Sequence, residues 1–349
     1  MTLPLVNHNK DAITLDSNFS TTRLVTREKP VITNDPSSKV ESVLFLPPNP
    51  ERKGEGGLRT KGYFKRSYDQ ESGLSDNLPL PLVTIITVVF NGEKYLEQTI
   101  QSVINQTYDN VEYIVIDGGS TDGTVDIIRK YEDKIDYWVS EPDEGISDAF
   151  NKGIRCSTGE LIGILNSDDW YQVDSVNAIV DFYRTLESRE RNNFVGFGDL
   201  FYPERNLFQF GDKNYSRLIN YLMPHLNHPS VFVSKNIYSS IGLFNKHFKF
   251  AMDFEFLKRC HNNKISFFYI NKLIANMRGE GVSNKYRNET LQEVFSISKN
   301  KLITQFYNVY FIWFYRFRLV KVNILNPKFL FKIVLNKIKY GSSLLVMVR

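Results

Sequence analysis

The sequence predicts an α/β fold in which a mostly parallel sheet is flanked by helices. Between residues 83 and 165, short apolar or β-branched runs alternate with amphipathic stretches, as in repeating strand–helix units. These runs show little alternation of polar and apolar residues, which is typical of strands covered on both faces. The chain has 349 residues, of which 42% are apolar, so it can bury a large core.

The first half of this pattern, over residues 81–173, is the more regular one. The run VTIITVVF predicts the first strand, and the helix expected over about 93–106 carries Leu96, Ile100 and Ile104 on one face. The strands and helices expected next are, in chain order, YIVID, TVDIIRKYE, DYWVS, ISDAFNKGI and LIGIL. We expect the connections between the parallel strands to be right-handed.

Residues 174–290 are expected to complete the same domain, 81–290, with a less regular pattern. A helix over DSVNAIVDFYRTL comes first, and a strand over NFVGFG and a ribbon over RNLFQFG follow. The later elements are expected over SVFVS, DFEFLKRC, SFFYI and LIANM. Such a mixture is expected of a substrate-binding half rather than of a repeating scaffold.

Residues 1–80 are predicted to form a mostly irregular extension. They are polar and are interrupted by DPSS, LPPNP and LPLPL, whereas VLFLPP is an apolar patch able to dock on the domain. The basic, glycine-rich run RKGEGGLRTKGYFKRS suggests either a phosphate-binding loop or a solvated loop. Because it lacks a preceding strand and a following helix, the solvated loop is favoured.

Residues 291–349 are predicted to form a basic amphipathic helical tail. No acidic residue follows Glu293, and Asn326, Pro327 and Gly341 are suited to the start and end of a helix. Such a tail either lies on an anionic membrane or packs on the domain with a solvated basic face. The two cysteines lack a disulfide or zinc spacing, the N-terminus lacks an apolar signal core, and no run reaches the roughly 20 apolar residues of a membrane span.

Polar or acidic residues follow the ends of four successive predicted strands. These residues are Asn91, Asp117, Glu141, Asp143, Asp168 and Asp169. The carboxyl ends of parallel strands meet at one crevice, where open α/β sheets bind ligands. Adjacent carboxylates such as Asp168 and Asp169 repel each other. A role as helix cap does not explain both, because one cap needs only one acceptor. A Mg²⁺ or Mn²⁺ ion that bridges to a diphosphate explains the pair best.

Three stretches carry a resemblance to a known family. They are PLVTIITVVFNGEKYLEQTIQSVINQTYDNVEYIVIDGGSTDGT, SEPDEGISDAFNKGI and GILNSDDW. Together they resemble the inverting family 2 glycosyltransferases of the GT-A fold, most closely the bacterial enzymes of O-antigen, capsule and exopolysaccharide synthesis. The resemblance covers about 83–173 and continues more weakly to about residue 287. It implies metal-dependent transfer of a sugar, from a UDP-sugar by preference, to a glycan or lipid-linked acceptor.

The resemblance also implies which residues contact the nucleotide-sugar. These are Thr87, Phe90, Asn91, Asp117, Asp148, Asn151, Lys152, Asn166 and Asp168. Many relatives have a second acid where this chain has Gly118, so the choice among uridine, guanosine and thymidine stays open. A solvated lysine remains the alternative for Lys152, and the three-residue spacing of Asp148 and Asn151 puts both on one helix face.

For the metal and the catalytic base, the resemblance points to two further segments. NSDD matches the metal motif, with Asp168 and Asp169 as ligands of Mn²⁺ or Mg²⁺ and Asn166 in the place of the motif's first acid. AMDFEFLKR implies that Asp253 deprotonates the acceptor hydroxyl, with Glu255 as the second choice. An acid favoured by a helix N-terminus is the alternative for Asp253, and His228 is expected on the acceptor side.

Two other functions remain alternatives to the glycosyltransferase. A sugar-phosphate nucleotidylyltransferase would show a glycine-rich loop after the first strand, which TVVFNGEKYL is not. A non-catalytic, membrane-bound carbohydrate-binding module is the other, because Gly118, Asn166 and Met252 depart from the family pattern. The expected location is the cytoplasmic face of the cell membrane, with a donor, an acceptor and anionic lipid as partners; nucleic acid is not expected.

Overall fold

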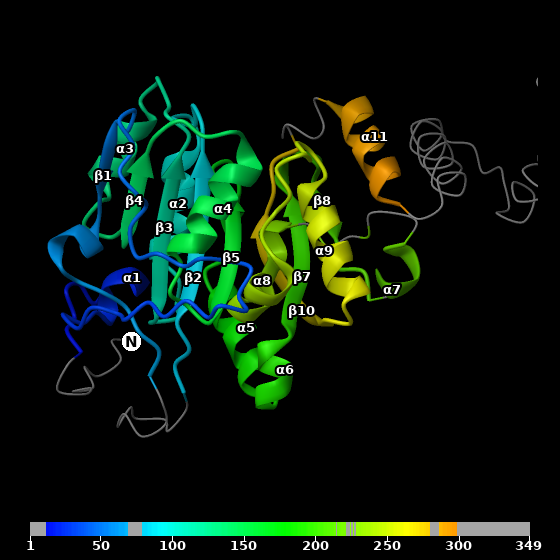
Figure 1. The fold of residues 1–349 in the computed structure, drawn as a ribbon, viewed down its shortest axis with the longest axis horizontal. Coiled ribbons are helices and arrows are strands. Elements are labelled where there is room, and N and C mark those ends of the chain that lie inside the picture. The colour runs from blue at the N-terminus through cyan, green and yellow to red at the C-terminus, as the bar shows by residue number, and fades with distance from the viewer. Residues whose placement is uncertain are drawn as a thin grey trace, which may run out of the picture. The chain divides into compact units, whose positions relative to one another are not determined.

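A single ten-stranded sheet with helices on both faces organises the structure (Figure 1). The computed structural model describes residues 12–68, 79–213, 215–220, 224, 226, 228–279 and 286–298. The strand order is β1-β4-β3-β2-β5-β9-β7-β10-β6. The tenth strand, β8, is not part of this order and pairs with β7. The expected α/β class, with a mostly parallel sheet flanked by helices, is confirmed. The helices expected beyond residue 298 lie outside the described residues.

The parallel core of the sheet comes from the four regular strands predicted between residues 83 and 166. In the order β4-β3-β2-β5 these strands are all parallel, whereas β1, β9, β8 and β6 pair antiparallel with their neighbours, and β7 and β10 pair parallel. The strands are β1 (Gly54–Gly56), β2 (Val83–Val89), β3 (Val111–Asp117), β4 (Tyr137–Ser140), β5 (Leu161–Asn166), β6 (Trp170–Tyr171), β7 (Phe194–Tyr202), β8 (Leu207–Gln209), β9 (Val231–Ser234) and β10 (Ser266–Asn276).

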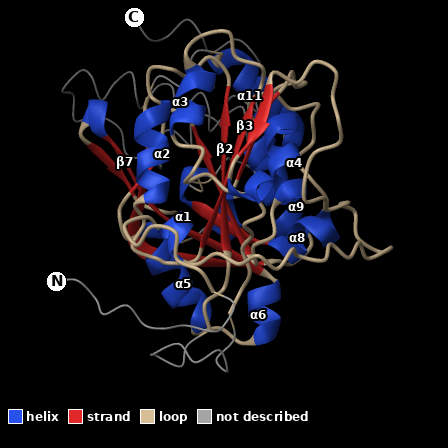
Figure 2. Cartoon of the chain, turned by 90° about the vertical axis from the view of Figure 1, so that its left-hand side faces the viewer, coloured by secondary structure: helices blue, strands red, loops and turns tan. Residues whose placement is uncertain are grey.

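Two hydrophobic cores lie on opposite faces of the sheet, because successive strand residues point to opposite sides. Helices α2, α3 and α5 cover one face, and α4, α8 and α9 cover the other (Figure 2). The helices are α1 (Ser20–Arg23), α2 (Leu96–Ile104), α3 (Thr124–Lys130), α4 (Ile146–Cys156), α5 (Ser175–Arg184), α6 (Ser188–Asn192), α7 (Tyr215–Leu218), α8 (Lys235–Ile241), α9 (Met252–Asn262) and α11 (Arg287–Ile297). The structure also contains the short 3₁₀ helices η1 (Leu58–Lys61) and η4 (His228–Ser230).

The N-terminal extension packs closely on the sheet. The predicted docking of VLFLPP is confirmed: Leu46 belongs to the core that contains α4, and Phe45 packs edge-on against Tyr137. The solvated loop expected over 52–67 is wrong. This run contains β1 and η1, and both Leu58 and Arg59 are buried. The reason is that Arg59 binds Glu112 and the carbonyls of Leu44 and Cys156 inside the domain.

The second half of the sheet differs from the expectation in one respect. The segments SFFYI and LIANM were expected as separate strands, but they form one strand, β10, with register shifts between Tyr269 and Ala275. Bulges keep such a strand continuous while they bend it. Within the described ranges, every helix falls short of the length and apolarity that a membrane span requires.

Candidate active site

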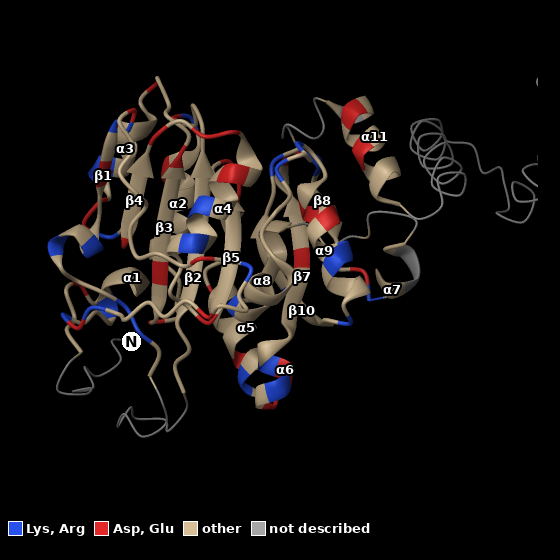
Figure 3. Ribbon diagram, viewed as in Figure 1, with Lys and Arg blue, Asp and Glu red and all other residues tan. Residues whose placement is uncertain are grey.

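The ends of the four parallel strands lie level with one another. In the register of the sheet Val89 of β2 is opposite Asp117 of β3, Asp117 is opposite Ser140 of β4, and Val88 is opposite Asn166 of β5. The loops that follow these strands therefore meet at one edge, and acidic residues gather in the loop between β4 and α4 (Figure 3). This edge is where open α/β sheets bind their ligands.

Asp117 is fully buried at this edge, and its carboxylate shapes the turn that follows. It accepts hydrogen bonds from the Ser120 backbone N–H at 3.0 Å, from the Ser120 hydroxyl, and from the Ser140 hydroxyl at 2.5 Å. Gly119 adopts a φ of +82°, a conformation that favours glycine. Asp117 thus links β3 to β4 and fixes the Gly118–Ser120 turn.

The residues expected beside the nucleotide base differ in their surroundings. The ring of Phe90 is 65% exposed at the end of β2, whereas Thr87 is buried in the sheet and accepts a hydrogen bond from the Tyr113 hydroxyl at 3.1 Å. Asn91 donates its backbone N–H to the Ser120 hydroxyl at 2.7 Å, and its side-chain oxygen accepts from the Thr121 N–H at 2.9 Å. Asn91 therefore bridges the two loops, and Phe90 is the side chain free to contact a ligand.

The two polar residues expected on α4 beside Asp148 have partners within the protein. The buried Asn151 amide exchanges two 2.9 Å hydrogen bonds with the backbone of Phe244. Lys152 lies 2.9 Å from Glu141 and donates to the Pro142 carbonyl at 2.9 Å. Both contacts hold α4 in place, so the proposed donor contacts of these residues stay predictions.

Asp148 lies on the first turn of α4 and faces Lys246. The nearest carboxylate oxygen and the Lys246 ammonium are 3.3 Å apart, and the Glu144 N–H donates to the other oxygen at 3.3 Å. The Asp148 side chain keeps 17% of its surface exposed. Its proposed sugar contact therefore competes with a surface ion pair, which is a weak interaction in water.

Asp143 is a candidate donor residue to which the sequence reasoning gave no role. A Cβ atom built on Gly118 would lie 2.5 Å from its Oδ2 atom, so Asp143 takes the space that a side chain at position 118 would need. Its Oδ1 atom accepts from the Gly145 N–H at 2.8 Å. Burial raises its pKa. The signal for this role in the sequence is that position 118 is a glycine, while two acids, Glu141 and Asp143, follow the third predicted strand.

The Asp168–Asp169 pair lies at the end of β5 with unsatisfied oxygen atoms. Asp169 is 1% exposed; its Oδ1 accepts from the Arg278 N–H at 3.0 Å, while its Oδ2 is buried and accepts no hydrogen bond from the described chain. The Oδ1 atom of Asn166 is buried without a partner there in the same way. Burial, and then the charge of Asp168, raise the pKa of Asp169 well above its usual value.

These donors fit a hard divalent cation. Buried, partnerless oxygens next to a second carboxylate are the ligands that Mg²⁺ and Mn²⁺ prefer, and a cation would remove the repulsion that raises the pKa of Asp169. Among the described residues no three His, Cys, Asp or Glu side chains come together as a metal cage. The residues therefore suit an ion that is completed by ligand oxygens.

Arg278 lies directly beside this pair and was not predicted. Its guanidinium lies 4.0 Å from the ring centre of Tyr95 and 4.7 Å from that of Trp170, and it donates to Gln98 at 2.6 Å. Arg278 comes soon after the predicted strand LIANM, and this position is the signal that could have identified it. That strand is the end of β10, which runs parallel to β7 and pairs with β6 at Trp170, next to Asp169. Arg278 fixes the Asp169 side of the site.

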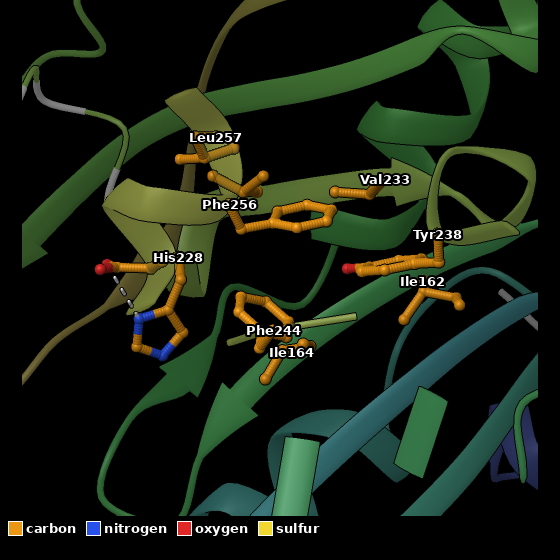
Figure 4. A pocket seen from close by; sticks show the side chains of 10 residues that line it. Ile162, Ile164, His228, Val233, Tyr238, Phe244, Phe256 and Leu257 are labelled. Carbon is orange, nitrogen blue, oxygen red and sulfur yellow. Dashed lines mark ion pairs between the residues drawn. The ribbon is translucent and has the colours of Figure 1, made fainter. Parts of the chain in front are cut away.

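Asp253 and His228 form a second polar group on the other half of the sheet. Asp253 is 8% exposed on the first turn of α9, and its Oδ2 lies 3.8 Å from Nδ1 of His228 (Figure 4). The Nε2 atom of His228 is buried without a partner among the described residues. Both side chains line a cavity of about 20 Å³ together with apolar residues such as Ile164 and Phe244.

Glu255, the second choice for the catalytic base, is engaged elsewhere. Its carboxylate accepts a hydrogen bond from Nε of Arg259 at 2.7 Å, one helical turn along α9. Arg259 in turn donates to the Ile241 and Leu243 carbonyls at 2.9 and 2.6 Å. Glu255 thus helps to attach α9 to the segment after α8, which favours Asp253 over Glu255 as the base.

The fold and this site define an α/β domain with a ligand crevice at the carboxyl ends of its parallel strands. Residues 84–237 match the family model described as Glycosyl transferase family 2. This stretch of the chain is therefore similar to the family 2 glycosyltransferases, and the sheet seen here agrees with the GT-A fold expected from the resemblance.

The chain is similar to several bacterial glycosyltransferases over about half its length. An uncharacterized glycosyltransferase of Rickettsia typhi is 30% identical over 189 residues, which are 52% of this chain and 59% of the relative. A PGL/p-HBAD biosynthesis glycosyltransferase of Mycobacterium tuberculosis is 27% identical over 187 residues, which are 52% of this chain and 71% of the relative. The chain thus spans about three fifths of the length of the Rickettsia protein.

Two solved structures align with part of this chain. Residues 1–349 of S. aureus TarS in complex with UDP-GlcNAc align with a TM-score of 0.48 at 18% identity, over 64% of this chain and 70% of that chain. A mannosyltransferase from Pyrobaculum calidifontis in complex with GDP-Man and Mn²⁺ aligns with a TM-score of 0.47 at 17% identity, over 74% and 69% of the two chains.

Proposed function

We propose that the protein transfers a sugar from a nucleotide-diphospho-sugar, by preference a UDP-sugar, to a hydroxyl group of a glycan or lipid-linked acceptor. The observation that carries this proposal is the row of acidic residues at the level ends of β3, β4 and β5, within the stretch that is similar to the family 2 glycosyltransferases. Phe90 is exposed beside this row and offers a face on which a base can stack. Asp117 and Asp143 flank the same turn.

The proposed cofactor is Mn²⁺ or Mg²⁺, held by Asp168 and Asp169 with Asn166 beside them. Support comes from the buried oxygens of Asp169 and Asn166, which have no partner within the described ranges. When bound, such an ion neutralises negative charge on the leaving diphosphate. The diphosphate itself would supply the remaining ligands, as is usual for Mg²⁺.

Asp253 is the proposed catalytic base. It takes the proton of the acceptor hydroxyl while the hydroxyl oxygen forms a bond to the anomeric carbon. The bond from that carbon to the diphosphate oxygen breaks, and the nucleoside diphosphate leaves with the electron pair on the opposite side, so the configuration inverts. His228, 3.8 Å away, is placed to orient the carboxylate or the acceptor.

We also propose that the protein acts at the cytoplasmic face of the cell membrane, in the synthesis of a surface polysaccharide such as an O-antigen. The support is the basic composition of residues 291–349 and the similarity to bacterial glycosyltransferases. A domain at 81–290, with an extension before it and this tail after it, is the organisation that we infer.

A thermal-shift screen against UDP-, GDP- and dTDP-sugars, each with Mn²⁺ or with EDTA, tests the donor site. A ligand that binds only the folded protein raises the melting temperature. We expect one nucleotide class to raise it in the presence of Mn²⁺, and Asp168→Ala to abolish the shift, whereas Asp181→Asn, at an exposed position of α5, keeps it. No shift with any donor would refute the proposal.

A further inference from the structure

The residues immediately before and within β1 lie against the loops of the candidate donor site. We propose that this segment, Asn49–Gly56, is part of the nucleotide-sugar site, in which Arg52 and Lys53 position the loops after β4 and β3 and Lys53 provides positive charge for the diphosphate of the donor. We call it the donor clamp. It lies outside the stretch 84–237 that matches the family model, and the inference rests on the proposed function.

The donor clamp is fixed to the sheet by main-chain hydrogen bonds. The Lys53 N–H donates to the Ser140 carbonyl at 2.7 Å, and β1 pairs antiparallel with β4, so that Gly54 is opposite Ser140 and Gly56 opposite Trp138. A Cβ atom on Gly54 or Gly56 would lie 2.8 or 2.6 Å from atoms of the Trp138 side chain. Glycine is therefore needed for β1 to cross this indole, and the position of the segment is built into the fold.

Lys53 holds the turn that follows β3. Its ammonium group donates to the Gly119 carbonyl at 2.7 Å and to the Ser120 carbonyl at 3.1 Å. Asp117 and Asn91 hold the same turn from the inside, through the N–H and hydroxyl groups of Ser120. Lys53 thus holds the carbonyl groups on the outer side of this turn. Asp117 and Asn91, two residues of the donor site, fix its inner side.

Arg52 holds the end of β4 in a similar way. Its guanidinium binds Glu141 through two nitrogens, at 2.9 and 2.8 Å, and donates to the Pro47 carbonyl at 2.6 Å. The other oxygen of Glu141 lies 2.9 Å from Lys152 of α4. Burial raises the pKa of Glu141, but Lys152 and Arg52 outweigh it and hold this pKa below its usual value.

The two cations also change the charge of the site. The acids of the crevice are Asp117, Glu141, Asp143, Asp148, Asp168 and Asp169, whereas a nucleoside diphosphate is itself anionic. Lys53 is an exposed residue whose ammonium group binds two carbonyls at the rim, where its charge favours the diphosphate. The charge of Arg52 is shared between Glu141 and Glu55, 2.8 and 2.7 Å away. Residues 84–237 alone would present these acids without either cation.

The test compares Lys53→Met with Lys61→Met in the full chain. Lys61 lies in the same extension, is 45% exposed and pairs with Glu132 at 3.2 Å, so its removal is a matched loss of charge away from the site. We expect Lys53→Met to raise the KM for the donor about tenfold, with kcat and the KM for the acceptor within twofold of wild type. Lys61→Met should leave all three constants unchanged, and Lys53→Arg should recover most of the donor affinity.

The melting temperature separates a donor-site role from a merely structural one. We expect the melting temperature of Lys53→Met, without ligand, to stay within about 2 °C of wild type, because it loses only two hydrogen bonds to the carbonyls of one loop. An unchanged donor KM in Lys53→Met, or an equal loss of donor affinity in Lys61→Met, would overturn the inference. A wild-type protein that binds no donor would instead refute the proposed function, and the clamp would have no site to complete.

Discussion

Gly118 and Asp143 show how a single missing side chain changes the proposed donor site. The Oδ2 atom of Asp143 reaches to within 2.5 Å of the place where a Cβ atom of residue 118 would be. The chain therefore has two carboxylates, those of Asp117 and Asp143, around the Gly118–Ser120 turn, and the second one comes from the loop after β4. Burial raises the pKa of Asp143, so this carboxylate is more readily protonated than an exposed one.

A double-mutant cycle tests this coupling. Gly118→Ala should displace Asp143 and lower donor affinity about tenfold, and Asp143→Gly should lower it by a similar factor because the carboxylate is lost. The double variant Gly118→Ala/Asp143→Gly should bind as weakly as either single variant, since both act through one group. Isothermal titration with the donor gives these affinities. If the loss of donor affinity in the double variant equals the product of the two single losses, Gly118 and Asp143 act independently, and the coupling is refuted.

At the scale of residues, the sequence predicted the acidic edge better than the individual contacts. Asp168 and Asp169 could be placed because they directly follow a strand. The donor contacts expected of Asn91 and Asn151 stay predictions, and both side chains also have hydrogen bonds to backbone groups far away in the sequence. Neither partner could be inferred from spacing, because such contacts depend on how loops meet after the sheet has formed.

At the scale of elements, the N-terminal extension is joined to the sheet by a buried ion pair. The Arg59 guanidinium lies 2.6 Å from Glu112 of β3, with the two side chains 2% and 1% exposed, and it also donates to the carbonyls of Leu44 and Cys156. Burial raises the pKa of Glu112, but Arg59 and hydrogen bonds from Thr158 and Thr84 outweigh it and hold this pKa below its usual value of 4.5. The pair joins three separate segments.

Glu112→Gln should therefore destabilise the protein strongly. It leaves the buried Arg59 without a counter-charge, which costs about 3–5 kcal/mol and lowers the melting temperature by on the order of 10 °C. Because the folded-state pKa of Glu112 is depressed, its contribution is present above pH 4.5 and is lost as the pH falls below it. The difference in melting temperature between Glu112→Gln and wild type should therefore become smaller at acid pH. Glu132→Gln, in an exposed pair, is the control and should change little.

The elements themselves were largely predictable where the hydrophobic pattern was strong. The strands from β2 to β5 lie within a few residues of the predicted runs, because each run is continuously apolar and bounded by polar turns. β1 was not predicted, since GEG has no strand propensity and forms a strand only through its pairing with β4. The antiparallel direction of β9 beside β5 likewise depends on tertiary packing.

At the scale of the molecule, the two halves of the sheet divide the proposed reaction between them. The donor residues follow β2 to β5, whereas Asp253 belongs to α9, and His228 precedes β9. A protein that only binds carbohydrate would have no need of an acid beside His228, so turnover separates the two functions.

The turnover of Asp253→Asn is the measurement that tests the account most directly. With the donor that gives a thermal shift and a panel of glycan acceptors, release of nucleoside diphosphate should fall at least about 100-fold in this variant, while donor affinity stays within twofold of wild type. Glu255→Gln should keep most of the activity, because Glu255 is bound to Arg259. Full turnover in Asp253→Asn, or a wild-type protein that binds the donor and never transfers its sugar, would contradict the account.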